Sequence, residues 1–377
     1  MQVDTHPAIM MRNEPLRVAQ GSDRAGLLIV GNFLSASVGT RGVCEELARQ
    51  LEDLDWLRIL TTSNKAQRIP RLLDMLMTIW RRRNDFQLAQ VDVYSGAAFL
   101  WAQITCAALR RLDKPYILVL HGGNLPRFAA RRPHRVRRLL QSAHIVTTPS
   151  HYLREQLAAY HPNILRVPNA IELGAYRFRL RQSPHPTLVW LRAFHEIYNP
   201  TLVPRVIRSL VNDHPDVRAI MIGPDKGDGS LQHTRQIAAE LGVLSRISFP
   251  GAVSKTETPT WLDQGDIFLN TSSVDNTPVS VLEAMACGLC VVSTNVGGLP
   301  YLLRGGTDAL LVDPDSVEGM DGAVRRLLTE PGLAERLSRN ARAEASQYDW
   351  AAVLPQWESL LRSSYPSHGA VMEGALD

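Results

Sequence analysis

Asp275 and Glu283 are the two acidic residues of the segment SSVDNTPVSVLEAMACG, and they stand eight positions apart. Between them, Thr277 and Pro278 predict a helix start, because a threonine hydroxyl can cap free amides and proline suits the first helical position. The residues that follow are almost all apolar or small, and Gly288 predicts the helix end. A helix of this composition is packed on most sides, so Glu283 is expected to be buried and to need a partner.

This arrangement can bind a phosphorylated ligand that is rich in hydroxyl groups. The start of a helix presents unpaired N–H groups and a partial positive charge, both of which suit phosphate. Carboxylates accept hydrogen bonds from hydroxyl groups. The residues alone leave one alternative open, in which Asp275 and Glu283 only cap and solubilise the helix.

The elements that must position these acids follow from an alternation of apolar strands with helical segments. Such alternation predicts parallel sheets with helices on both faces. Ligands of such sheets bind at the carboxyl ends of the strands. Strands are predicted within residues 27–33, 56–62, 89–96, 115–123, 144–150, 187–194, 217–225, 246–251 and 266–273.

The chain of 377 residues is long enough for two domains, each with its own core. A turn-rich, basic segment lies near its middle, and we interpret it as an interdomain linker. The predicted organisation is a flexible N-terminal tail over residues 1–25, a first Rossmann-like domain over 26–170, the linker over 171–186 and a second Rossmann-like domain over 187–350.

The composition is that of a soluble globular protein, with 45% hydrophobic and 21% charged residues. The charge is unevenly distributed, because residues 1–183 contain 26 Lys and Arg against 14 Asp and Glu, whereas the remaining residues contain 15 against 23. This asymmetry predicts that the two halves have different partners.

The cysteines do not predict a metal site. Cys287 and Cys290 form a single C-x-x-C pair, and Cys44 and Cys106 lie far from it in the sequence. A structural zinc ion needs about four ligands, and no second pair or histidine cluster is present. We therefore expect no metal and reduced thiols, as in the cytoplasm.

We predict neither a secretory signal nor a membrane-spanning helix. Residues 1–18 contain acidic residues and no apolar core, so they do not form a secretory signal. The longest uncharged run, Val93 to Leu109, falls short of the ~20 apolar residues of a membrane-spanning helix. We interpret this run as a core helix.

Together these segments resemble retaining glycosyltransferase family 4, the glycosyl transferases of group 1. The resemblance covers nearly the whole chain after residue 26. It is carried by the two acids ahead of EAMACG, by CVVSTNVGGLPYLLRGGTDALLVDP, by IVTTPSHYLREQL followed by LRVPNAIEL, and by YDWAAVLPQWESLLR. It implies an α/β protein of the GT-B fold, with two Rossmann-like doubly wound parallel-sheet domains facing across a cleft. It also implies that residues 351–377 begin with a helix that returns to the first domain and end as a tail.

The resemblance implies roles for the acids. Glu283 would accept hydrogen bonds from the ribose of a nucleotide donor, and Asp275 would hold hydroxyls of the donor sugar. The segment between them would face the sugar and the diphosphate; its residues are Asn276, Thr277, Pro278 and Val279. Retention in this family is explained without a covalent enzyme intermediate. The resemblance also implies no metal, and no cofactor beyond the nucleotide sugar.

Two first-domain residues also match the family pattern. His121 would lie near the transferred sugar, and a strand-end histidine bonded to the backbone is its alternative. Gly39 would let the backbone approach the phosphates closely, and an ordinary tight turn is its alternative. The surrounding loop has neither a Walker A sequence nor a G-x-G-x-x-G fingerprint.

One departure from the family concerns the diphosphate. The family has an arginine followed about five residues later by a lysine, and Arg192 matches only the arginine. The expected lysine is replaced in the neighbourhood of Tyr198. We predict that Lys226 compensates and shares the diphosphate with Arg192.

Two arginine-rich segments, 81–83 and 127–138, predict contact with an anionic membrane surface. The alternative is a solvated basic face. Nucleic acid is not a predicted partner, because no aromatic-rich surface or known motif accompanies the arginines.

The predicted function is therefore transfer of a sugar, with retention, from a nucleotide-sugar donor to a glycan or lipid-linked acceptor, in cell-surface polysaccharide synthesis. The enzyme would be cytoplasmic and peripheral on the inner face of the membrane. A non-catalytic nucleotide-binding relative and a nucleotide-sugar epimerase are the alternatives. The sequence does not identify the base, the sugar, the acceptor or the linkage.

Overall fold

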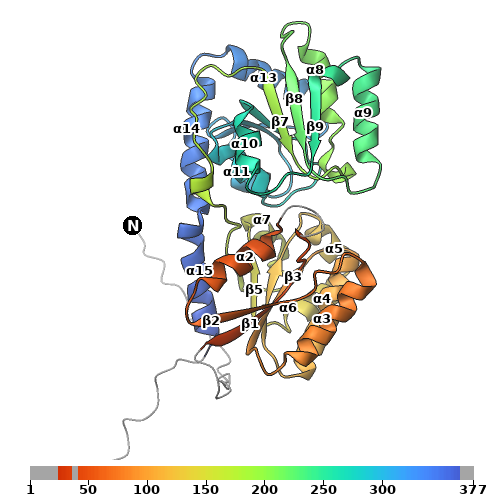
Figure 1. Ribbon diagram of the computed structural model, residues 1–377, viewed down its shortest axis with the longest axis vertical. Coiled ribbons are helices and arrows are strands. Elements are labelled where there is room, and N and C mark those ends of the chain that lie inside the picture. Colours follow the sequence, from red (N-terminus) through yellow and green to blue (C-terminus); the bar gives the residue numbers. More distant parts are fainter. Residues whose placement is uncertain (1–23, 36–40, 366–377) are drawn as a thin grey trace, which may run out of the picture.

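The computed structural model describes residues 24–35 and 41–365. It contains two α/β domains, one above the other along the long axis of the molecule (Figure 1). Each domain is built on a six-stranded sheet whose strand pairs are all parallel. The predicted fold class, GT-B with two doubly wound domains, is confirmed.

The first domain has the strand order β2-β1-β3-β4-β5-β6. Apolar runs such as LLIV and YILVL form its strands, as expected where helices cover both faces of a sheet. Helices α3 to α7 pack on one face, and α2 packs on the other. The strands are Ala25–Val30 (β1), Leu57–Thr61 (β2), Leu88–Val93 (β3), Tyr116–Leu120 (β4), Ile145–Thr148 (β5) and Ile164–Arg166 (β6), and the helices are Val43–Glu52 (α2), Arg68–Arg81 (α3), Ala97–Arg111 (α4), Leu125–Arg131 (α5), Pro133–Leu140 (α6) and His151–Leu157 (α7).

The second domain has the strand order β12-β11-β10-β7-β8-β9. Residues of α8, α9 and α13 form the core on one face, and residues of α10, α11 and α12 contribute to the core on the other. The strands are Thr187–Leu191 (β7), Arg218–Ile222 (β8), Ile247–Gly251 (β9), Ile267–Asn270 (β10), Cys290–Thr294 (β11) and Ala309–Val312 (β12), and the helices are Leu202–Leu210 (α8), Ser230–Glu240 (α9), Thr258–Asp263 (α10), Val279–Ala286 (α11), Leu299–Leu302 (α12), Val317–Thr329 (α13) and Leu333–Ala345 (α14).

The last helix, Trp350–Ser364 (α15), runs back along the first domain (Figure 1). Its apolar side chains join the core formed by α2 and the sheet. Trp56 Nε1 donates a hydrogen bond of 3.1 Å to Glu358 Oε1 of this helix. The chain thereby crosses between the domains twice.

The segment predicted as a linker is fixed to the second domain. It contains a single short 3-10 turn, Leu173–Ala175. The guanidinium of Arg181 is completely buried and donates to the carbonyl oxygens of Gly265 and Cys287. Buried hydrogen bonds of this kind leave the segment little freedom to move against that domain.

One predicted core helix is shorter than expected. The run predicted as one core helix contains the end of β3 and a turn, and the helix α4 begins only at Ala97.

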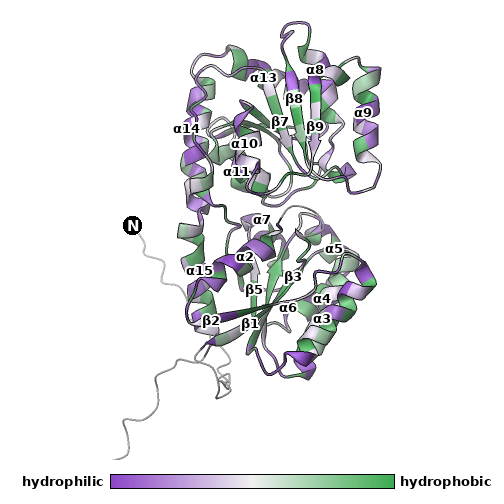
Figure 2. Ribbon diagram, viewed as in Figure 1, coloured by the Kyte–Doolittle hydropathy of each residue, from purple (hydrophilic) through white to green (hydrophobic). Residues whose placement is uncertain are grey.

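The four cysteines are free and buried. Within residues 24–35 and 41–365, no helix has the length and hydropathy needed to cross a bilayer. Figure 2 shows hydrophobic and hydrophilic residues together on most of the outer helices.

Candidate functional site

The helix that carries Glu283 begins one residue later than predicted. Pro278 is its cap residue, with an extended backbone (φ −70°, ψ 121°), so Thr277 lies one position before the cap. Proline disfavours a helical conformation for the residue before it, which places Thr277 outside the helix. The helix ends at Ala286, and Gly288, the predicted stop, follows its cap residue Cys287 with a φ of 75° that suits glycine.

Glu283 is 3% exposed and has two partners on its Oε1 atom. The Tyr176 hydroxyl donates a hydrogen bond of 2.6 Å, and Lys255 Nζ forms an ion pair. Burial and the charge of Glu283 raise the pKa of Tyr176, so its hydroxyl remains a donor. The sequence predicted that this carboxylate needs a partner but identified neither of these residues.

Asp275 is 8% exposed and forms an ion pair with Arg192. The Ser272 hydroxyl and the Asn276 amide each donate a hydrogen bond of 2.9 Å to its carboxylate. Arg192 follows β7 and Asp275 follows β10, and these two strands are paired in the sheet. Their carboxyl ends therefore bring together two residues 83 positions apart.

Two buried polar atoms beside these acids are unsatisfied. Arg192 Nε and Ser280 Oγ have no hydrogen-bond partner in the part of the chain that the structure describes. Ser280 lies in the first turn of α11, and the Arg192 guanidinium lies 4.6 Å from the centre of the Tyr198 ring. Burial lowers the pKa of Arg192. Unsatisfied buried donors at a helix start are available to a bound anion.

The same segment meets the first domain. A side chain on Gly123, which follows β4, would overlap the backbone carbonyl of Asp275. The Ser150 hydroxyl donates to Asn276 Oδ1, and Asn169 Nδ2 donates a hydrogen bond of 2.9 Å to the Thr277 carbonyl. The site is thus at the contact between the carboxyl ends of the two sheets (Figure 1).

His121 lies in the first domain two residues before Gly123, and it is buried. Its Nε2 is 3.2 Å from Asp92 Oδ1, and its ring stacks on Tyr94 with centroids 5.0 Å apart. The His121 side chain therefore interacts with a carboxylate of the neighbouring strand β3. The alternative interpretation had expected a backbone partner. A carboxylate in this place fixes the orientation of the imidazole.

The other residues that were predicted to bind the nucleotide-sugar donor differ in burial and location. Pro278 is buried and Val279 is half-buried at the start of α11. Lys226 is exposed in the loop after β8, and it forms no ion pair with any residue in the described ranges. Gly39 lies outside the described residues. Lys255, which sequence analysis missed, is the second cation in contact with the predicted acids.

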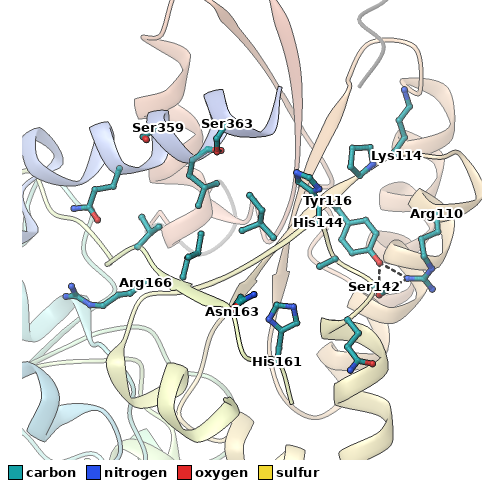
Figure 3. A pocket seen from close by; sticks show the side chains of 18 of the residues that line it. Arg110, Lys114, Tyr116, Ser142, His144, His161, Asn163, Arg166, Ser359 and Ser363 are labelled. Atoms are coloured by element: carbon teal, nitrogen blue, oxygen red, sulfur yellow. Dashed lines mark hydrogen bonds between the residues drawn. The ribbon is translucent and has the colours of Figure 1, made fainter. Parts of the chain in front are cut away.

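A cavity with a volume of about 1210 Å³ lies elsewhere in the first domain. Figure 3 shows it between α15, strand β6 and the starts of β4 and β5. His144 and His161 point toward it, and Arg110 donates a hydrogen bond of 2.7 Å to the Tyr116 hydroxyl in its wall. These strand starts are opposite to the strand ends that carry His121, so this cavity is separate from the candidate site.

Among residues 24–35 and 41–365, no group of three or more His, Cys, Asp or Glu side chains is arranged to hold a metal ion. Burial raises the pKa of Cys287 and Cys290 to about 12. Both thiols are therefore protonated at neutral pH.

The two domains match two family models. Residues 177–344 match the glycosyl transferases of group 1, and residues 40–174 match glycosyltransferase family 4. Together the matches include every strand except β1 and every predicted site residue except Gly39. The chain belongs to this family of glycosyltransferases.

Curated relatives are similar to this chain over part of their length. A D-inositol 3-phosphate glycosyltransferase of Streptomyces bingchenggensis is 27% identical over 205 residues, which are 52% of this chain and 45% of the relative. The corresponding protein of Acidothermus cellulolyticus is 30% identical over 157 residues, 40% of this chain and 35% of the relative. The chain thus matches less than half the length of these relatives.

Solved structures agree over nearly the whole fold. Sucrose-phosphate synthase from Thermosynechococcus elongatus has a TM-score of 0.76 at 16% identity and covers 90% of this chain and 99% of its own. HepE from Anabaena, solved in complex with UDP, has a TM-score of 0.69 at 16% identity and covers 90% of this chain and 100% of its own. At these identities the likeness establishes the fold.

Proposed function

We propose that this chain is a retaining glycosyltransferase that moves a sugar from a nucleoside diphosphate sugar to a glycan or lipid-linked acceptor. The reaction would serve cell-surface polysaccharide synthesis on the cytoplasmic side of a membrane. The observation that carries the proposal is the pair of buried acid–cation contacts, Asp275 with Arg192 and Glu283 with Lys255, beside the start of α11. The carboxylates suit hydroxyl groups of the ligand, and the cations and free amides suit its diphosphate.

In the proposed complex, Glu283 accepts hydrogen bonds from the ribose, and Asp275 accepts them from the donor sugar. The Arg192 guanidinium and the Ser280 hydroxyl, each with an unsatisfied buried atom, face the diphosphate. His121, held by Asp92, approaches the transferred sugar from the first domain. The fold shared with HepE, which was solved with UDP and with UDP-glucose, supports uridine diphosphate as the first nucleotide to test.

The protein supplies positioning and charge stabilisation to this reaction. The bond from the anomeric carbon to the diphosphate breaks, and the acceptor oxygen bonds to the same face of that carbon. The departing diphosphate accepts the proton of the acceptor hydroxyl. Arg192 stabilises the negative charge that develops on the leaving group, and the two acids keep the sugar and ribose in place.

A thermal-denaturation series with UDP, GDP, ADP and their sugars tests the donor class. A ligand that binds only the folded chain raises its melting temperature. Proton NMR of the product then reports the anomeric configuration, which we expect to match that of the donor. Stabilisation without hydrolysis or transfer would indicate a non-catalytic binder, and a free epimerised nucleotide sugar would indicate an epimerase.

Lys255, rather than Lys226, is proposed to supply the cation that the family motif lacks at Tyr198. Lys255 is one-third exposed and pairs with Glu283, whereas Lys226 is exposed and forms no ion pair with either acid. We expect Lys255→Ala to weaken donor binding by about 10- to 100-fold, since one charged hydrogen bond contributes roughly 1.5–3 kcal/mol.

Lys226→Ala is the matched control and should change the donor dissociation constant by less than about twofold, as expected for a solvated charge. Calorimetric titration with the nucleotide identified by thermal denaturation measures both variants. Equal affinities for Lys255→Ala and the unmodified protein, or a larger loss for Lys226→Ala, would contradict this assignment.

A further inference from the structure

Helix α3 presents a row of large apolar side chains to solvent. Ile69, Leu73, Met77 and Trp80 are 74%, 61%, 45% and 57% exposed. Their spacing of four, four and three residues puts them on one side of the helix. The opposite side packs into the domain core through Met75 and Ile79. The core of the first domain is therefore formed without the apolar row.

The surface around this row is strongly basic. Helices α3, α4, α5 and α6 together contain ten arginines, nine of which are exposed, and one acidic residue, Asp74. All four helices contribute to the core on one face of the first sheet. Helix α4 packs beside α3 and adds Leu100, which is 48% exposed. Arg135 of α6 donates a hydrogen bond to Gln103 of α4, which joins the basic helices to the same surface.

This surface, which we call the α3 face, is formed by the outer sides of α3, α4, α5 and α6. Figure 1 shows α3 and α4 on the outside of the first domain, and Figure 2 shows both hydrophobic and hydrophilic residues on α3. Arg71, in the first turn of α3, donates a hydrogen bond of 2.9 Å to Asn32, which follows β1. The apolar row therefore begins near the edge of the sheet that faces the candidate site.

We propose that the α3 face binds an anionic lipid bilayer, with the row from Ile69 to Trp80 inserted at the boundary between headgroups and acyl chains. The arginines of the neighbouring helices would contact the lipid phosphates. Helices that combine an apolar side with basic residues bind membrane surfaces in this way. The proposal goes beyond sugar transfer, because bilayer binding is measured without any donor.

Two other occupants fit the α3 face less well. A second copy docked through the same surface would bring two sets of arginines together, and like charges at an interface oppose association. A nucleic acid would satisfy the arginines, but phosphate contacts do not require four exposed apolar side chains. A bilayer satisfies both the charge and the apolar row.

Sedimentation with vesicles tests the proposal. We expect the unmodified protein to sediment with vesicles of mixed phosphatidylglycerol and phosphatidylcholine and to remain in solution with phosphatidylcholine alone. The double variant Leu73→Gln, Trp80→Gln should partition about tenfold less, because it removes much of the inserted apolar area. Leu244→Gln, at a 41% exposed leucine of the second domain, is the matched control and should bind as the unmodified protein does.

The outcomes separate the alternatives. Equal melting temperatures of the variants show that folding is intact, as expected for exposed side chains. Failure of the unmodified protein to bind phosphatidylglycerol vesicles would overturn the proposal. So would unchanged binding of the double variant, since the arginines alone would then explain the attraction. Dimers in sedimentation equilibrium that the double variant dissociates, or preferential binding to duplex DNA, would assign the surface to those partners instead.

Discussion

Replacing Glu283 by glutamine is expected to lower kcat/KM for the donor by about 100-fold, because hydrogen bonds to a charged group contribute roughly 1.5–3 kcal/mol. Glutamine keeps the size of the side chain and can still accept the hydrogen bond from the Tyr176 hydroxyl. It removes the charge that pairs with Lys255 and that we assign to the ribose. Steady-state kinetics at varied donor concentration measures the effect.

The matched control is Glu330→Gln. Glu330 pairs with Arg326 on the surface of the second domain, where both side chains are exposed. Surface pairs of this kind contribute about 0–1 kcal/mol, so kcat/KM should remain unchanged. Full activity of Glu283→Gln would show that this buried acid serves only to hold Lys255 and Tyr176 together.

Replacing Arg192 by alanine is expected to reduce both stability and donor binding. Asp275 would be left buried without its cation, and breaking a buried ion pair in this way costs about 3–5 kcal/mol. The diphosphate would lose the guanidinium whose Nε is unsatisfied in the free protein. Denaturant unfolding measures the stability, and calorimetric titration measures the donor affinity.

A second substitution separates these two effects. Adding Asp275→Asn to Arg192→Ala removes the uncompensated charge and should restore most of the stability, but it should not restore donor binding. Arg326→Ala, from the surface pair with Glu330, is the control and should cost less than about 1 kcal/mol. Recovery of donor affinity in the double variant would contradict the assignment of Arg192 to the diphosphate.

Much of the fold could be predicted because its signals are local. Apolar runs between helical segments define the strands of both sheets, and glycines such as Gly288 mark element ends. The burial of Glu283 followed from the apolar character of its own helix. The prediction of Thr277 as a helix cap failed because Pro278 keeps the preceding residue extended, and the Thr277 carbonyl is bonded to Asn169 of the first domain.

The features that the sequence did not predict depend on contacts between residues that are far apart in the chain. Tyr176 and Lys255 meet Glu283 from positions 107 and 28 residues away, and no spacing rule connects them. The ion pair of Arg192 with Asp275 depends on β7 and β10 being neighbours in the sheet. The exposed row on α3 was missed for the same reason, since its apolar residues look like core residues until the packed side of the helix is known.

The most direct test of the central claim is a crystal structure with the nucleoside diphosphate that most raises the melting temperature. The account predicts a ribose against Glu283 and a diphosphate against Arg192, Ser280 and the start of α11, between the two domains. A nucleotide bound in the cavity beside His144 and His161, or anywhere that leaves Asp275 and Glu283 without a contact, would contradict it.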